Sequence, residues 1–165
     1  MDLQSVMAIM IAVIIIGVAY LIKEVLAIKF AMKDGSAEKS SLQLQAYERL
    51  AVFAERAGLK NLISRSDTYG QSAAVLHGVL IENIRSEYDY NVSQQVYVSK
   101  EIWEAVTKLK DQNIYIINQL GGSLPPHATS LDLSKRILEY SLTQNSELNL
   151  IVLDAIQHEA KKLLN

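Results

Sequence analysis

The sequence contains no cysteine, and it has only two prolines and seven glycines among 165 residues. Without cysteine, a disulfide framework, a thiolate nucleophile and a metal site built on thiolates are all excluded. So little proline and glycine also excludes a disordered chain of low complexity. A strong basic field is missing too, because residues 34–165 carry 13 basic and 16 acidic side chains. The composition therefore predicts no nucleic-acid partner and one ordinary domain.

Motifs that carry known chemistry are absent from the sequence as well. It has no phosphate-binding loop, no G-x-G-x-x-G, no G-x-S-x-G and no H-E-x-x-H. The three histidines, His77, His127 and His158, stand in no metal-ligand spacing, and His77 is expected opposite the apolar stripe of its helix. We therefore predict a protein that is not an enzyme and that needs no cofactor and no metal.

The most distinctive feature that is present is an apolar run at residues 6–22, with 16 hydrophobic residues, one glycine and no charge. As a helix the run spans about 26 Å, and residues 3–5 extend it to about 30 Å, the thickness of a hydrocarbon core. A cleaved signal peptide would need a basic start and a small-residue cleavage site. Only Asp2 precedes the run, and Lys23 and Glu24 follow it. The pattern predicts a retained transmembrane helix in contact with the lipid bilayer.

Four lysines follow the run, at positions 23, 29, 33 and 39, and no basic side chain precedes it. The positive-inside rule places the chain after the run in the cytoplasm and the N-terminus outside. A stripe at 3,4 spacing continues beyond the run, formed by Leu21, Val25, Ile28 and Met32. It predicts a stalk within residues 1–33 that packs on its own domain or on lipid headgroups, or that joins copies of the chain into a homo-oligomer.

Residues 34–40 form a short polar stretch that we interpret as a linker, and residues 41–165 then show helical periodicity. The fold class predicted is all-α: a transmembrane helix and stalk, followed by a cytoplasmic bundle of four or five helices. The first helix is expected from a capping box at Ser40 to Ala57, with Gly58 as a left-handed terminating residue. Arginines and one lysine give this helix and its exit a basic bias, which favours a solvated face near an anionic leaflet: Arg49, Arg56, Lys60 and Arg65.

The remaining helices are predicted from caps and stripes. A second helix follows the capping pattern Thr68-x-x-Gln71, and a third begins at the N-cap Ser99 and ends before the prolines at 125 and 126. A fourth is expected over residues 130–142 and a fifth from about residue 146 to residue 162.

The segment from Tyr88 to Val98 is ambiguous. Its valines and tyrosines alternate as in a strand, whereas residues 84, 88, 92 and 96 lie four apart as in a helix. We favour the helix, because an isolated strand leaves its backbone groups unpaired. The polar and aromatic side chains here predict either a buried network that sets helix register or a partner-docking face, formed by Tyr88, Tyr90, Asn91, Gln94, Gln95, Tyr97 and Trp103.

Two stretches also suggest a family. Residues 42–50, LQLQAYERL, and residues 91–99, NVSQQVYVS, followed by Trp103, resemble a family of small, uncharacterised membrane-anchored proteins of Bacteroidota. The resemblance covers nearly the whole chain. It implies one N-terminal transmembrane helix, a helical cytoplasmic domain and a place in the bacterial inner membrane, and it implies no activity and no catalytic residue.

The resulting hypothesis is an interaction protein, an accessory subunit that contacts other subunits of a membrane complex. Self-assembly through the stalk is a compatible alternative. A membrane-tethered enzyme or small-ligand binder is a third, and it would use polar residues between Glu87 and Gln95 together with Tyr140.

Overall fold

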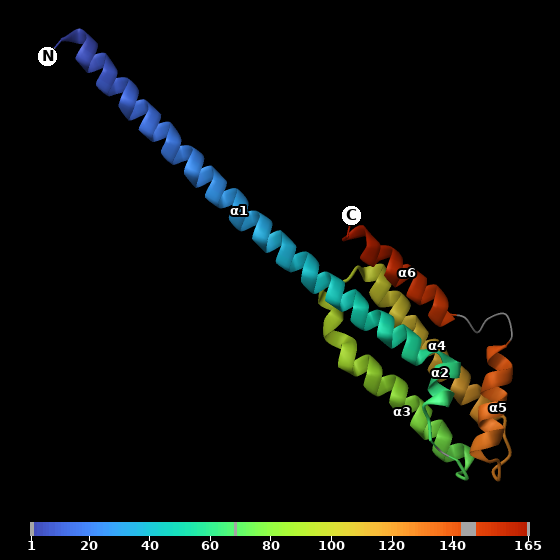
Figure 1. The fold of residues 1–165 in the computed structure, drawn as a ribbon. Coiled ribbons are helices and arrows are strands. Elements are labelled where there is room, and N and C mark those ends of the chain that lie inside the picture. Colours follow the sequence, from blue (N-terminus) through green and yellow to red (C-terminus); the bar gives the residue numbers. More distant parts are fainter. Residues whose placement is uncertain (1, 68, 143–147, 165) are drawn as a thin grey trace. The chain divides into compact units, whose positions relative to one another are not determined.

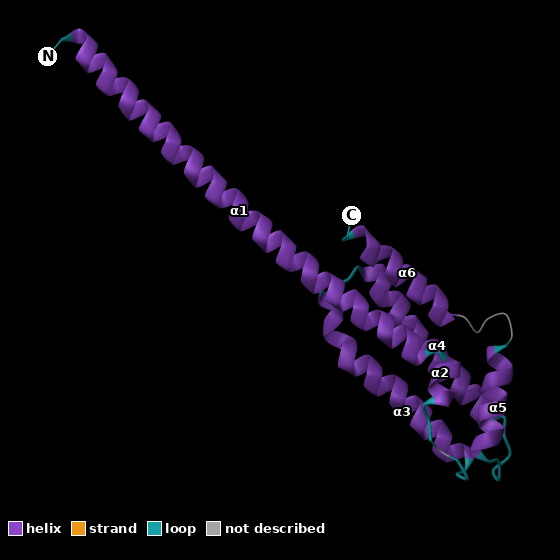
Figure 2. Cartoon of the chain, in the orientation of Figure 1, coloured by secondary structure: helices purple, strands orange, loops and turns teal. Residues whose placement is uncertain are grey.

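The computed structural model describes residues 2–67, 69–142 and 148–164, with the backbone alone at residues 3–6, 8, 9, 12, 13 and 30–37. Its elements are all helical, which confirms the all-α prediction (Figures 1 and 2). They are α1 (Leu3–Ala57), α2 (Leu59–Ser64), α3 (Ala73–Asn91), the 3-10 helix η1 (Val92–Val96), α4 (Lys100–Gly122), α5 (Ser130–Ser141) and α6 (Leu148–Lys162). The described residues contain no strand, only one isolated bridge between Ser72 and Thr129.

The chain divides into two units, residues 1–41 and residues 42–165. The first consists of the N-terminal part of α1, whose described apolar side chains are exposed over residues 7–28. No helix in the part of the chain that the structure describes is both long and apolar enough to cross a membrane.

The capping box predicted at Ser40 is not the start of a helix. Helix α1 continues without interruption through residues 34–40, so these residues are helical and Ser40 does not begin a helix. The polar composition was misleading because alanine, glutamate and lysine, at 37–39, are all good helix formers. The single Gly35 costs only about 1 kcal/mol in a helix interior, too little to end a helix.

In the second unit the last turns of α1 pack into the bundle through one face. The face repeats at helical spacing, with Tyr47, Leu50 and Ala54 each at most 5% exposed. These residues belong to the first of two hydrophobic clusters, which α1 builds with the first half of α4 and with α6: Tyr47, Leu50, Phe53, Ala54, Ala57, Ile102, Val106, Leu109, Val152 and Ile156. The hydrophobic periodicity of the predicted first helix was therefore interpreted correctly.

The second cluster joins α2, α3, α5 and the second half of α4. It is formed by aliphatic residues: Leu59, Leu62, Leu76, Leu80, Ile84, Ile116, Ile117, Leu133 and Ile137. Helix α4 thus contributes to both clusters, and α3 lies beside α4 and α5 (Figure 1). Between the two groups of α4 residues stands the buried Asn113, whose Nδ2 donates to the carbonyl of Ala57 at 2.7 Å. A buried carbonyl at the end of α1 is satisfied in this way.

Helix α1 ends at Ala57 as predicted, but the reason differs. Gly58 has φ −56°, so it is not the left-handed residue expected from the sequence. A Cβ atom at this position would lie 2.8 Å from Nδ2 of Asn149 on α6. The Asn149 side chain would therefore have to shift to admit a larger residue here. The chain turns directly into the short helix α2, which the sequence did not predict.

The other helix starts agree with the predictions to different degrees. The Ser99 side chain accepts a hydrogen bond from the Ile102 N–H, which confirms this N-cap. Helix α3 starts later than predicted, with Ser72 as its N-cap, and Thr68 lies outside the described residues. Helices α5 and α6 occupy the regions predicted for the last two helices, and the expected start near residue 146 lies outside the described residues too.

A capping box starts α5. The backbone N–H and the hydroxyl of Thr129 both donate to Oδ2 of Asp132, at 2.9 and 2.7 Å. The Thr129 hydroxyl oxygen accepts in turn from the N–H of Asp132. The hydrogen bonds from Thr129, the side-chain one first, hold the pKa of Asp132 below its usual value.

Candidate docking groove between α1 and α3

The ambiguous segment is helical, and its strand interpretation is wrong. Helix α3 runs to Asn91 and continues as the 3-10 helix η1. This change of helix type turns the chain toward α4, so the four-residue spacing ends at Val92 and does not extend to Val96.

The amides of the predicted docking set make local hydrogen bonds. Asn91 is buried, and its Nδ2 donates to the Glu87 carbonyl at 2.8 Å. Gln94 is buried as well and donates to the Ser93 hydroxyl at 3.1 Å. The exposed Gln95 donates to the Val92 carbonyl at 2.9 Å. Asn91 and Gln95 thus bond backbone carbonyls where α3 passes into η1, and Gln94 bonds a neighbouring hydroxyl, which favours the structural interpretation for these amides.

Two aromatic members of the set pack against the first cluster. The rings of Tyr88 and Trp103 lie 5.2 Å apart, and Tyr88 meets Phe53 edge-on at 6.1 Å. The Tyr88 hydroxyl is 3.0 Å from that of Thr107, and the Lys110 ammonium lies 4.4 Å from the Tyr88 ring centre. Contacts of this kind hold α3 to α4 and leave little of these rings for a partner.

Besides Gln95, the exposed members of the set are Tyr97 and Tyr90, and Tyr90 is 69% exposed. The Arg49 guanidinium lies 5.3 Å from the Tyr90 ring centre, and its Nη2 is 3.5 Å from the Tyr90 hydroxyl. The second distance is long for a hydrogen bond, so the ring contact is the main interaction. It joins the α1 and α3 sides of a groove.

The groove between α1 and α3 has a volume of about 230 Å³. Its lining combines apolar, aromatic and charged groups: Glu48, Arg49, Val52, Arg56, Glu87, Tyr90 and Asn91. Val52 is 53% exposed, because it does not lie on the buried face of α1. We refer to these seven residues as the α1–α3 groove.

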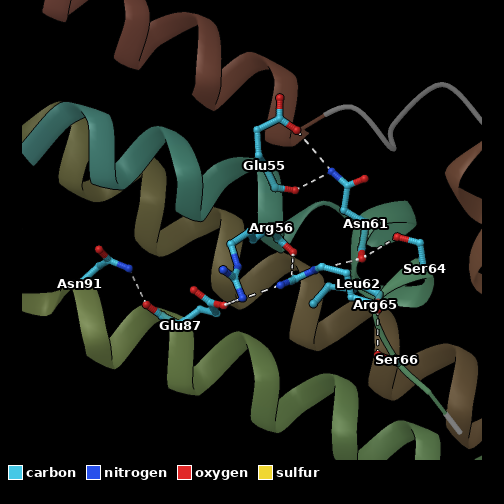
Figure 3. Close-up of polar contacts among 9 residues, drawn as sticks. All are labelled: Glu55, Arg56, Asn61, Leu62, Ser64, Arg65, Ser66, Glu87 and Asn91. Atoms are coloured by element: carbon cyan, nitrogen blue, oxygen red, sulfur yellow. Dashed lines mark hydrogen bonds and ion pairs between the residues drawn. The ribbon is translucent and has the colours of Figure 1, made fainter.

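An ion-pair network borders the groove (Figure 3). Oε1 of Glu87 accepts Arg56 at 2.5 Å and faces Arg65 at 3.7 Å. Arg65 is held further by bonds to the backbone carbonyls of Arg56, at 2.8 Å, and Asn61, at 3.2 Å. One carboxylate on α3 therefore meets guanidiniums from the end of α1 and the end of α2. Partly exposed pairs contribute about 0–1 kcal/mol each, so the network orients these groups more than it stabilises them.

The opposite side of the α1–α2 junction carries a separate polar contact. Nδ2 of Asn61 donates to the carbonyl of Glu55 at 2.7 Å and lies 3.3 Å from its carboxylate (Figure 3). Ser64 and Ser66 bond backward to the carbonyls of Asn61 and Leu62. The turn after α1 is thus held by its own side chains, which fixes the direction of Arg65.

The remaining candidate residues lie apart from the groove. His77 does not lie opposite the buried face of α3 as predicted: its Nε2 is 2.8 Å from Oδ1 of Asn118 on α4. Residues 77 and 80 are three apart, so His77 lies beside the buried Leu80 on the side of α3 that meets α4. Tyr140 packs against the second cluster, so the structure does not bring it to Glu87. Among the described residues no three His, Asp or Glu side chains are grouped to hold a metal. Leu21, Val25 and Ile28 are exposed, and the side chain of Met32 lies outside the described residues.

Sequence reasoning identified only part of the groove. It singled out Tyr90 and Asn91 as docking candidates, and it noted Arg49 and Arg56 as a basic bias without linking the two sets. The linking contact joins residues 49 and 90, which lie 41 positions apart. No local pattern predicts a pair at that separation. Val52 carried no signal either, since a valine beside a buried stripe is common.

Comparison with known proteins places the chain in a family. Residues 2–163 match DUF7935, a family of unknown function, and the chain belongs to it. The expected membership of an uncharacterised family over nearly the whole chain is thereby confirmed, whereas the bacterial phylum and the membrane anchor stay predictions. No curated protein and no solved structure matches the chain.

Proposed function

We propose that this member of DUF7935 is a single-span protein of the bacterial inner membrane whose cytoplasmic helical unit docks onto other subunits of a membrane complex. It acts as an accessory subunit and not as an enzyme. The observation that carries the proposal is a contrast in apolar exposure. The described apolar side chains of residues 7–28 are exposed on every side of one helix, whereas residues 42–165 contain two buried apolar clusters.

The exposure around α1 supports the anchor. A helix that is apolar all round is either buried in a large core or placed in a membrane. The exposed side chains include Ile14, Ile15 and Ile16 in succession, which cannot share one face of a helix. Ten Ile, Val and Leu residues within positions 6–22 favour insertion by about 3–6 kcal/mol on the scale for a helix centre.

The α1–α3 groove supports the docking role. Arginine and tyrosine are enriched where proteins bind one another, because they supply large contact areas with directed hydrogen bonds. At about 230 Å³ the groove is smaller than the 300–1,000 Å³ typical of small-molecule pockets. Partner side chains therefore suit it better than a drug-sized ligand.

The experiment that tests the anchor uses the absence of cysteine. Single cysteines are introduced as Gln4→Cys and Lys161→Cys and treated with a membrane-impermeant thiol reagent. We expect Gln4→Cys to be labelled in intact spheroplasts, and Lys161→Cys only after permeabilisation. Equal labelling of both positions before permeabilisation, or recovery of the chain in the soluble fraction, would contradict the proposal.

The docking role is tested by the native mass of the chain extracted in mild detergent from its own membranes. A reproducible assembly with the same identified companions is the expected result. A mass equal to one chain plus its micelle would reject both docking and self-assembly.

Self-assembly through the stalk is the second candidate, favoured by the exposed Leu21, Val25 and Ile28 at 3,4 spacing. The double substitution Val25→Lys and Ile28→Lys is expected to reduce a homo-oligomer to single chains. An assembly of unchanged mass would reject this candidate.

A further inference from the structure

We propose that the α1–α3 groove binds an acidic segment of a partner protein, in which one carboxylate stands beside an apolar side chain. The inference rests on the proposed function, since it names the chemistry of the partner that docks. It is carried by the charges around the groove and by how the described residues already pair them.

The guanidiniums at the groove are not equally satisfied. Glu87 is engaged by Arg56 and Arg65, so two positive groups share one carboxylate. Arg49 has no carboxylate partner among the described residues, and its polar contacts are with the ring and hydroxyl of Tyr90. Arg56 and Arg65 share Glu87, and the lining adds one further carboxylate, Glu48. With Arg49, three guanidiniums therefore stand against two carboxylates, a net charge of +1 for this group of residues.

The geometry suits a carboxylate. The Arg49 guanidinium lies 5.3 Å from the Tyr90 ring centre, a contact that holds it at the groove, and arginine binds carboxylates through two parallel N–H groups. The Arg56 side chain is about half exposed even though it pairs with Glu87, and it lines the groove together with Arg49. Val52, between the two arginines on α1, supplies an apolar contact beside the charge.

The same features disfavour a lipid headgroup as the occupant. An anionic membrane surface attracts clusters of uncompensated Lys and Arg. Here Glu48 and Glu87 lie in the lining, and they would repel a surface of many anionic headgroups. A protein segment places one carboxylate among the arginines and avoids these acids, so a partner protein fits better.

The test replaces Tyr90 with the photo-reactive residue benzoylphenylalanine in the full chain, in its own membranes. The matched control carries the same residue at Tyr115, a tyrosine on α4 that is 60% exposed and lies outside the groove. After irradiation, cross-linked peptides are identified by mass spectrometry. We expect the position-90 probe to cross-link to a peptide of another protein that carries Asp or Glu at the reacted site, well above the yield at position 115.

Charge reversal then tests the arginine. Arg49→Glu is expected to lower the position-90 yield about tenfold, and replacement of the partner's carboxylate by Lys is expected to restore it. Arg136→Glu, at an exposed arginine on α5, serves as the control and should leave the yield unchanged. Equal melting temperatures of the two variants show that neither has unfolded.

Several outcomes would overturn the inference: no adduct above the position-115 yield, adducts with lipid, adducts with a second copy of the chain, or adducts that persist in Arg49→Glu. If the chain still migrates in a large membrane assembly in these cases, only the inference fails. If it migrates alone, the proposed docking function fails with it.

Discussion

The N-terminal and C-terminal parts of α1 belong to one helix and are both rich in apolar residues, but the first part exposes these residues and the second buries most of them. Over residues 7–28 the described apolar side chains are exposed on all sides. Over residues 46–57 most of them lie on one face, where Tyr47, Leu50, Phe53 and Ala54 are buried by α4 and α6, and the exposed Val52 lies off this face. The difference teaches that apolar content alone does not place a helix in a core, because burial requires a face that a neighbour can cover.

The polar residues explain why the second part has a face. Glu48, Arg49, Glu55 and Arg56 alternate with the buried positions and point to solvent or to the groove. In residues 6–22 no charged side chain marks a solvent side.

The largest effect is expected from the packed part. Phe53→Ala removes a fully buried ring that contacts Tyr88, and it should lower the free energy of unfolding by about 3–5 kcal/mol, measured by urea denaturation. Tyr115→Ala removes an exposed ring and should change it by no more than about 0.5 kcal/mol. Similar losses in both variants would show that burial does not separate the two positions.

The next effect concerns the exposed part. Ile16→Arg should raise the free energy of membrane insertion by about 3–4 kcal/mol, close to the whole favourable total of the run. We expect a large fall in the membrane-bound fraction after alkaline extraction, with no change for Ile16→Ala. Full retention of the arginine variant in the membrane would refute the anchor.

A smaller effect is expected where the packed part ends. Asn113→Ala leaves the buried Ala57 carbonyl without its donor and should cost about 1–3 kcal/mol in the free energy of unfolding. Gln112→Ala, at the exposed neighbouring position, should cost less than about 0.5 kcal/mol. If the two variants unfold alike, this hydrogen bond does not hold the end of α1.

The smallest effect is expected in α5, outside both parts of α1, and it serves as a reference for the other predictions. The pKa of Asp132 is lowered by the hydrogen bonds from Thr129, so its stabilisation is complete above its unfolded pKa of about 3.9 and is lost as the pH falls through the lower folded value. Asp132→Asn should therefore lower the melting temperature slightly at pH 7 and progressively less below pH 3.9. Asp154→Asn, on the exposed side of α6, should show no such trend. A difference that is constant from pH 7 to pH 3 would contradict the capping role.

Local signals predicted the helices where the side chain and the backbone it bonds are neighbours in sequence. Ser99 is an example, because its side chain accepts from the N–H of Ile102 three residues later. The helix start predicted at Ser40 is wrong, because the preceding polar residues favour helix and α1 continues through them. The prediction also failed at Gly58, since no local pattern shows that Asn149 approaches from another helix.

The candidate groove was predicted in part for the same reason. Tyr90 was expected at a docking face, but Tyr88 and Trp103 of the same set turn into the bundle. Sequence alone does not separate them, because all three are aromatic residues with polar edges. Whether each of these rings is buried or exposed depends on which face of its helix packs against a neighbouring helix.

The sequence by itself determined the class of the protein: all-α, without cysteine chemistry, with an uncharged apolar run followed by helices of ordinary composition. Composition and periodicity are properties of neighbouring residues, so they are readable along the chain. Only the tertiary structure decided that Arg49 meets Tyr90, that Glu87 is shared by Arg56 and Arg65, and that Asn113 satisfies the end of α1. Each of these contacts joins helices far apart in sequence, and side-chain packing between helices, not local propensity, selects them.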